Sequence, residues 1–120
     1  MVKRNKIIVT GGAGFVGTNL IKFLLEKTKF KIISIDNYSS GIKSNHIKNN
    51  RVKYIEGKTT YISQLIKKPR EINSIFHFGE FARIYQSFLK MNECIESNTI
   101  GSNAVFNFCL KNKIRLIYQQ

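Results

Sequence analysis

Four closely spaced glycines are the residues of this chain best suited to bind a phosphate group. Gly11, Gly12, Gly14 and Gly17 follow the apolar run at 7–9 and open a segment with apolar residues at helical spacing. Glycines at such positions permit a tight turn, let a pyrophosphate approach the main chain, and let a helix pack closely on a strand. The first turn of a helix also presents free N–H groups and a partial positive charge. The spacing therefore predicts a strand, turn and helix that bind a diphosphate.

A carboxylate stands where the second half of such a site is expected. Asp36 ends the apolar run at 31–35, about 20 residues after the glycines, where an acidic residue accepts hydrogen bonds from the adenosine ribose. A 2′-phosphate would meet Asp36 as a like charge with no adjacent arginine to offset it. The pattern therefore predicts NAD as the cofactor in preference to NADP. In the alternative interpretation, the glycines form only a tight turn and Asp36 merely ends a strand; the agreement of several separate elements favours the cofactor site.

The glycines fit two known spacings, and the residue that precedes them favours one of the two. Gly12-x-Gly14-x-x-Gly17 is typical of dehydrogenases in general, whereas Gly11-x-x-Gly14-x-x-Gly17 is a second spacing that Thr10 directly precedes. The whole pattern from Thr10 to Gly17 resembles the extended short-chain dehydrogenase/reductase superfamily. The run Asp-Asn-Tyr-Ser-Ser-Gly at 36–41 resembles its NAD-dependent epimerase/dehydratase family, of the UDP-glucose 4-epimerase type. The likeness continues through 75–79, 98–103 and 115–118, so it covers almost the whole chain.

The resemblance implies a set of residues in contact with NAD at the glycine turn, after the second strand and after the fourth. They are Gly11, Gly14, Phe15, Val16, Gly17, Asp36, Asn37, Ser40, Gly41, Phe78, Gly79 and Asn98. Asn98 would stand near the nicotinamide; a polar helix residue packed under the sheet is an equal alternative. Two positions depart from the family pattern. Glu80 is charged where a small residue is usual, and Lys58 follows Gly57 where an acidic residue commonly contacts the adenine, so adenine binding should be weakened without being abolished.

No catalytic residue and no metal site can be assigned from the sequence. Tyr54 and Lys58 match the superfamily's Tyr-x-x-x-Lys spacing, but they are predicted to span a strand and its turn. The catalytic pair needs one helical turn between the phenol and the lysine that lowers its pKa. The resemblance implies that the catalytic Tyr-x-x-x-Lys helix and the sugar-binding domain follow the fifth strand. We therefore expect an N-terminal part of an epimerase or dehydratase that is inactive alone, with a nucleotide-sugar substrate only in a full-length form.

Histidines and cysteines are expected to be structural. His77 lies between Phe76 and Phe78 in an apolar strand, which is typical of a hydrogen-bonded core imidazole, and His46 has no partner that the sequence identifies. Cys94 and Cys109 are predicted to lie on one helix, too far apart for disulfide geometry. Both are expected to be reduced packing residues.

Strand-like and helix-like segments alternate along the chain. Strands are predicted at 7–9, 31–36, 52–56, 74–78 and 115–118; helices are predicted from about 15, at 62–66 before Pro69, and over 94–111, with a polar loop at 37–50. Strict alternation implies a parallel, doubly wound α/β sheet of about five strands with right-handed crossovers, a Rossmann-type fold. Residues 1–120 are expected to form one NAD-binding domain, truncated before a sixth strand. The apolar edge at 115–118 predicts self-association or marginal stability.

The net charge of +13 favours a competing interpretation, nucleic-acid binding. The lysines are dispersed, however, with no run longer than a pair such as Lys67-Lys68, and no aromatic platform of the RNA-binding kind is present. No segment is apolar and long enough for a membrane span or a secretory signal, so a cytoplasmic protein is expected. Three functions remain open: the NAD-binding portion of an epimerase or dehydratase, a noncatalytic nucleotide-binding module completed by a partner chain, and, less favoured, a basic nucleic-acid binder.

Overall fold

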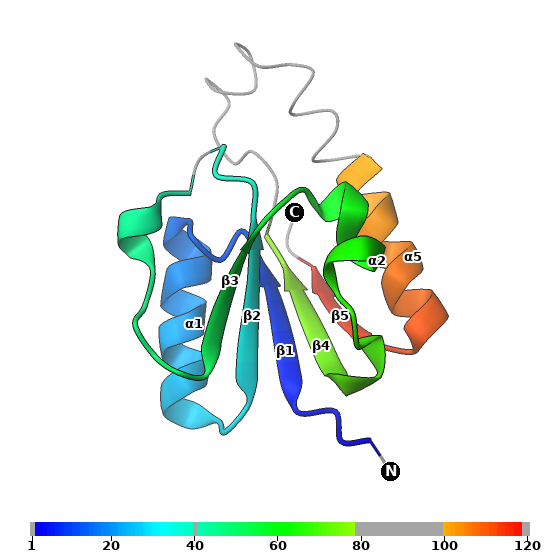
Figure 1. The fold of residues 1–120 in the computed structure, drawn as a ribbon, viewed down its shortest axis with the longest axis horizontal. Helices are drawn as coiled ribbons and strands as arrows, with labels where there is room; N and C mark the ends of the chain where they lie inside the picture. The colour runs from blue at the N-terminus through cyan, green and yellow to red at the C-terminus, as the bar shows by residue number, and fades with distance from the viewer. Residues whose placement is uncertain (1, 40, 79–99, 119–120) are drawn as a thin grey trace.

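A parallel β-sheet forms the centre of the chain (Figure 1). The computed structural model describes residues 2–39, 41–78 and 100–118. Its strands are β1 (Lys6–Thr10), β2 (Lys31–Asp36), β3 (Val52–Glu56), β4 (Ile72–His77) and β5 (Arg115–Tyr118). They lie side by side in the order β3-β2-β1-β4-β5, and every pairing is parallel. The chain runs outward from β1 in both directions, so the predicted doubly wound, Rossmann-type sheet is confirmed.

Helices cover both faces of this sheet. The helix α1 (Phe15–Lys27) connects β1 to β2 on one face, and α5 (Ser102–Asn112) lies on the other beside the short α2 (Ile62–Leu65) (Figure 1). Single-turn 3₁₀ helices occupy Lys43–Asn45, Thr59–Tyr61 and Pro69–Glu71. This two-sided cover explains why β1, at the centre of the sheet, is an almost continuous run of apolar residues.

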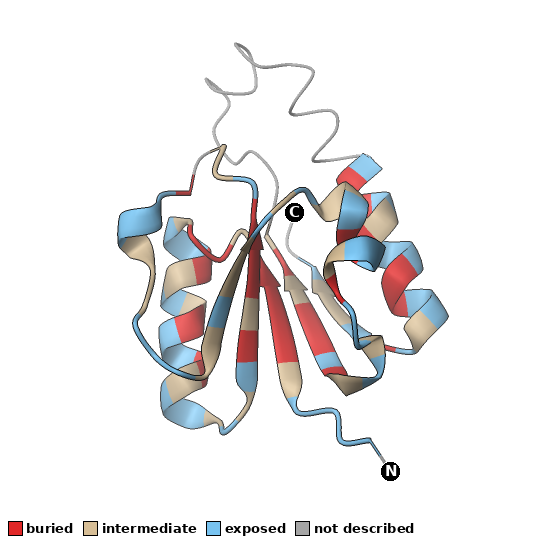
Figure 2. Cartoon of the chain, viewed as in Figure 1, coloured by how far each residue is buried: buried red, intermediate tan, exposed pale blue. Residues whose placement is uncertain are grey.

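The alternation of side chains along β1 divides the core into two layers. Ile7 and Val9 belong to the cluster that includes Ile21 of α1. Ile8, which points to the other face, belongs to the cluster that includes Val105 of α5. Figure 2 shows the buried residues along the central strands and on the sheet-facing sides of both helices. Both faces of the sheet are therefore occupied by core packing, and the ends of its strands remain available to bind a ligand.

Some boundaries differ from those that the sequence predicts. The helix α2 ends at Leu65, and Pro69 opens a 3₁₀ helix rather than ending the α-helix, because the fixed φ of proline suits a first helical position. The strand β4 begins two residues earlier than predicted, at Ile72, and ends at His77. Part of the predicted helix at 94–111, including Cys94, lies outside the described residues. The described helix ends at Asn112, where Lys113 adopts a left-handed conformation with φ 57°.

The two outer strands in the described part of the sheet are β3 and β5. The self-association predicted from the apolar edge at β5 stays a prediction. Cys109 is buried on α5 as a free thiol, as expected, and burial raises its pKa to about 11. None of the described helices is long and apolar enough to cross a membrane.

Candidate dinucleotide-binding site

A tight glycine turn follows the carboxyl end of β1. Gly11 has a φ of 71°, the left-handed region that favours glycine, and it is the residue of this turn with a positive φ. Its N–H donates a hydrogen bond of 2.7 Å to the carbonyl of Ile35, and Gly14 N–H donates one of 3.1 Å to the carbonyl of Gly11. The turn is therefore closed on itself and fastened to the neighbouring strand β2. Of the two glycine spacings, the one that begins at Gly11 contains the residue with the left-handed backbone.

Two other glycines are required by close packing. A Cβ atom on Gly17 would lie 2.2 Å from the carbonyl oxygen of Gly11, so the first turn of α1 rests directly on the glycine turn. A Cβ atom on Gly12 would lie 2.1 Å from Oγ of Ser34 on β2. Both contacts are too short for any larger residue unless the backbone moves.

Gly14 differs from these glycines because the protein itself leaves room for a side chain there. The nearest atom to a Cβ on Gly14 would be the carbonyl oxygen of Gly11 at 3.4 Å, an ordinary contact. Its φ of −83° and ψ of −179° are open to other residues. Gly14 is half-buried, and no described atom crowds its Cβ position at the point where α1 begins. That opening fits a ligand group that approaches the main chain.

The first turn of α1 suits an anion. Gly14 is the N-cap and supplies no side-chain hydrogen bond, and the first turn contains no acidic residue. The first N–H groups of a helix have no acceptor within the helix, and they carry a partial positive charge. Phe15 and Val16 are exposed, with relative accessibilities of 82% and 50%. Exposed residues at the start of a helix suit the approach of a phosphate to the first N–H groups.

The carboxylate of Asp36 lies against this turn. It is buried at the end of β2, with 7% of its surface exposed. Oδ2 accepts a hydrogen bond of 3.0 Å from Ala13 N–H, and Oδ1 accepts one of 2.8 Å from Tyr38 N–H. A carboxylate offers about four lone-pair positions, so each oxygen retains the capacity to accept another donor. Asp36 thereby joins the glycine turn to the loop after β2 and is still able to accept hydrogen bonds from a ligand.

The loop after β2 folds over the glycine turn at Ala13. The carbonyl of Ala13 accepts hydrogen bonds from Ile42 N–H at 3.1 Å and from Nδ2 of Asn45 at 2.7 Å. Gly41 is buried in this contact. Asn37 is exposed, and its Oδ1 accepts a hydrogen bond of 3.0 Å from Ser39 N–H within the loop. Ser40 lies outside the described residues.

An aromatic cluster supports the same loop from the β3 side. The hydroxyl of Tyr38 and Nε2 of His46 are 2.6 Å apart in a hydrogen bond, and the His46 ring stacks on Tyr54 at 3.8 Å between centroids. The structure thus supplies the partners of His46 that the sequence did not identify, because contacts between a loop and a strand leave no local signal in the sequence. Burial, together with the nearby charges of Asp36 and Glu56, raises the pKa of Tyr38.

Tyr54 and Lys58 do not form a helical Tyr-x-x-x-Lys pair. Tyr54 lies within β3, and Lys58 follows the end of that strand. The Tyr54 hydroxyl accepts a hydrogen bond of 2.9 Å from Ile47 N–H. The prediction that these two residues span a strand and the turn after it is confirmed.

A buried hydrogen-bond network closes the β4 side of the site. Thr10 Oγ1 accepts a hydrogen bond of 2.8 Å from Phe78 N–H and lies 2.7 Å from Nδ1 of His77. Nε2 of His77 lies 3.0 Å from Oγ of Ser102, at the start of α5. His77 is thus the hydrogen-bonded core imidazole that the sequence predicts, and Phe78 lies beside the end of β1. The roles of Thr10 and Ser102 were missed, because they depend on the register that pairs Thr10 with His77.

The remaining predicted site residues, Gly79 and Asn98, lie outside the described residues, as does Glu80. No group of three or more histidine, cysteine or acidic side chains suited to a metal ion occurs in the ranges that the structure describes. The geometry therefore brings together Gly14, the start of α1 and the carboxylate of Asp36, at the carboxyl ends of β1 and β2. This region lies beside the switch point of the sheet, between β1 and β4, where doubly wound sheets bind ligands.

Comparisons with known proteins point the same way. A sequence model described as the NAD dependent epimerase/dehydratase family matches residues 7–119. The Bordetella bronchiseptica enzyme WbmF, solved in complex with NAD+, is similar over 98% of this chain and 36% of its own, with 27% identity and a TM-score of 0.86. A UDP-glucose 4-epimerase from Thermotoga maritima, solved with UDP-glucose, is 27% identical over 94% of this chain and 37% of its own, with a TM-score of 0.77.

An epimerase from Methanothermobacter thermautotrophicus shares the fold, with a TM-score of 0.85 at 23% identity over 97% of this chain and 35% of its own. The present chain thus spans about a third of the length of these solved proteins.

Proposed function

Since the chain belongs to the NAD-dependent epimerase/dehydratase family, we propose that it binds NAD at the carboxyl ends of β1, β2 and β4, as the cofactor-binding portion of a nucleotide-sugar epimerase or dehydratase. The observation that carries this proposal is the position of the Asp36 carboxylate. It is hydrogen-bonded to Ala13, inside the glycine turn that opens α1.

Each part of the site has a role in this proposal. The pyrophosphate lies over Gly14, where a Cβ would meet no atom of the described residues closer than 3.4 Å, and accepts hydrogen bonds from the N–H groups of Phe15 and Val16. Gly11 and Gly17 keep the turn tight beneath it. The adenosine ribose donates its hydroxyls to the free lone pairs of Asp36.

The other predicted contacts extend the site on both sides. Asn37, Ser40 and Gly41 belong to the loop beside the adenosine, and Phe78, Gly79 and Asn98 belong to the nicotinamide side. When bound, NAD supplies a hydride acceptor and donor for a sugar carbon. The residues of this chain hold and orient that cofactor.

We further propose that these 120 residues bind NAD without converting a nucleotide sugar. The match to Tyr-x-x-x-Lys in the sequence is Tyr54 with Lys58, which lie in and beyond a strand, and the Tyr54 hydroxyl is engaged by Ile47. A tyrosinate base needs a lysine one helical turn away to lower its pKa. The solved relatives are longer, and this chain covers about a third of their length.

The proposal is tested by calorimetric titration of the chain with NAD and with NADP. NAD should bind at one site and more tightly than NADP, because the 2′-phosphate would face the Asp36 charge. Asp36→Asn keeps the size of the side chain, removes its charge and replaces one of its two acceptor oxygens with a donor NH2 group. It should therefore weaken the binding of NAD and reduce the preference for NAD over NADP. Glu26→Gln, on the exposed surface of α1, is the matched control and should change neither affinity. Absence of NAD binding by the folded chain would refute the proposal.

A further inference from the structure

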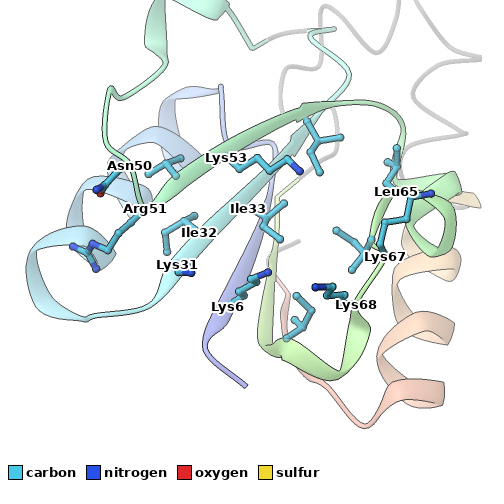
Figure 3. A pocket seen from close by; sticks show the side chains of 14 residues that line it. Lys6, Lys31, Ile32, Ile33, Asn50, Arg51, Lys53, Leu65, Lys67 and Lys68 are labelled. Carbon is cyan, nitrogen blue, oxygen red and sulfur yellow. The ribbon is translucent and has the colours of Figure 1, made fainter. Parts of the chain in front are cut away.

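A pocket of about 320 Å³ lies away from the glycine turn, toward the other end of the sheet (Figure 3). Lys6, Lys31 and Ile72 line it, and each is the first residue of its strand. The glycine turn instead follows Thr10, at the carboxyl end of β1. The volume falls at the lower end of the range for small-molecule sites in proteins. No residue of this pocket belongs to the proposed NAD site.

The floor of the pocket is apolar. Ile33 and Ile55, on adjacent strands, and Leu65 of α2 contribute side chains that are only partly buried against the core. In Figure 1, α2 and α5 lie on the β4 and β5 side of the sheet. Apolar surface is thus left available at the pocket between β2, β3 and the segment that follows α2. A ligand with an apolar body would remove this surface from water.

The walls of the pocket are strongly cationic. Five lysines line it from different elements: Lys6, Lys31, Lys53, Lys67 and Lys68. Figure 3 shows the side chains of Lys6 and Lys68 extending toward one another across the pocket. Arg51 also lines it, but its guanidinium donates to the carbonyls of Thr28 at 2.8 Å and Phe30 at 3.1 Å. The arginine therefore has a structural role, and the lysines are the groups able to meet a ligand.

Acidic groups offset little of this charge. Glu71 accepts a hydrogen bond from Lys6 in an ion pair of 2.6 Å, and it is the carboxylate within 4.0 Å of these lysines in the described ranges. The hydrogen bond from Lys6, followed by the charges of Lys6, Lys68 and Lys31, lowers the pKa of Glu71 against the opposing effect of burial. Several lysines thus act on one carboxylate. Lys53 and Lys67 have no ion pair with any described residue.

We propose that this pocket binds a small anionic amphiphile, with the apolar body on Ile33, Ile55 and Leu65 and the phosphate or carboxylate among the lysines. An anion relieves the repulsion between the ammonium groups, and the apolar body covers the part of the Ile33 and Ile55 side chains that is still exposed. A simple inorganic anion obtains only the first gain and an uncharged apolar molecule only the second, so neither obtains both. A phosphate and a carboxylate share this chemistry, so both are used as probes.

The binding is tested by titrating the full 120-residue chain, below the micelle concentration, with decyl phosphate and with decanoate. Calorimetry gives the affinity, and backbone amide shifts give the location. Both probes should bind at one site and shift the amides of Ile33, Ile55 and Leu65. Inorganic phosphate, decyltrimethylammonium and a single-stranded oligonucleotide serve as comparison ligands. Each should bind at least about tenfold more weakly, because each lacks either the anion or the apolar body.

Charge-reversal variants then locate the anion. The double variant Lys53→Glu with Lys68→Glu should lower the affinity for decyl phosphate by about tenfold or more. Lys22→Glu with Lys48→Glu makes the same change in net charge at exposed positions outside the pocket, and it should change the affinity by less than about twofold. Lys67→Glu is a milder single variant if the double variant fails to fold. NAD affinity should be unchanged in every variant, which keeps this test separate from that of the proposed function.

The proposal is overturned by any of three results. The first would be that decyl phosphate binds the folded chain no more tightly than inorganic phosphate does. The second would be that the control double variant weakens the binding of decyl phosphate as much as the pocket double variant does. The third would be that the oligonucleotide binds the same lysines as tightly as decyl phosphate does. The last two results would assign the effect to the diffuse charge of the chain.

Discussion

A Cβ atom on Gly41 would lie 2.6 Å from Oδ2 of Asp36, so the loop after β2 closes on this carboxylate through a residue that has no side chain. The same carboxylate accepts hydrogen bonds from Ala13 and Tyr38. Asp36 is thus the point where the strand, the loop and the glycine turn meet. The residue proposed to bind ribose also determines the shape of its own surroundings.

Gly41→Ala should therefore displace the loop from Asp36. The added methyl group would also lie 3.0 Å from the backbone carbon of Ala13, which has little freedom to move. We expect the free energy of unfolding to fall by about 1–3 kcal/mol and NAD to bind more weakly. Urea unfolding and calorimetry measure the two effects. Unchanged stability would show that the loop does not close on the carboxylate in solution.

Gly14→Ala and Gly17→Ala should separate ligand binding from folding. At position 17 the methyl group would lie 2.2 Å from the carbonyl oxygen of Gly11, so the chain should be strongly destabilised. At position 14 the methyl group would meet, among the described residues, only an ordinary contact of 3.4 Å. The stability of Gly14→Ala should then change by less than about 1 kcal/mol, while NAD affinity falls. Circular dichroism melts and NAD titration test the pair; equal losses of stability would contradict this account.

Thr10→Val should destabilise the chain more than Ser34→Ala does. Both changes remove a fully buried hydroxyl from the central strands. The Thr10 hydroxyl serves Phe78 N–H and His77, whereas Oγ of Ser34 has no hydrogen-bond partner among the described residues. Thr10→Val should cost about 1–3 kcal/mol because buried partners lose their hydrogen bonds, and Ser34→Ala should be neutral or stabilising. Chemical denaturation measures both; equal effects would argue against the network.

Cys109 should react with thiol reagents only when the chain unfolds. Burial raises the pKa of this thiol from 9.0 to about 11, so the native thiolate is scarce. In a Cys94→Ser background, labelling at about pH 8 should be slow in buffer and fast in urea. The unfolded thiol ionises at its ordinary pKa, so the contribution of this group to stability is complete below pH 9.0 and is lost as the pH rises toward about 11. Rapid labelling of the native chain would contradict the burial of Cys109.

The sequence predicted the elements whose signals are local. The glycines and the apolar runs beside them locate β1 and α1, and the end of the second run locates Asp36 at the carboxyl end of β2. The alternation of these runs along the chain gives the doubly wound sheet. Each of these features depends on neighbouring residues, so one chain without relatives is enough to find them.

Contacts between distant segments could not be predicted in this way. The hydrogen bond between Thr10 and His77 depends on the parallel register of β1 and β4, and the stacking of His46 on Tyr54 depends on how a loop folds onto β3. The pocket lined by Lys6, Lys31, Lys53, Lys67 and Lys68 brings together residues that are dispersed in the sequence. For this reason the sequence alone indicates only that the positive net charge is spread along the chain. The spacing of residues along the chain does not show which distant segments come into contact.

The most direct test of the central claim is to map NAD binding on backbone amides of the 120-residue chain by NMR. If NAD lies on the opening at Gly14 and on Asp36, the amides of Gly14, Phe15, Val16 and Asp36 should shift together on titration. Those of Lys53 and Lys68, in the pocket toward the other end of the sheet, should not. Saturable shifts confined to the first group are the result we expect. No shifts in that group, or shifts centred on the lysine pocket, would contradict the proposed site.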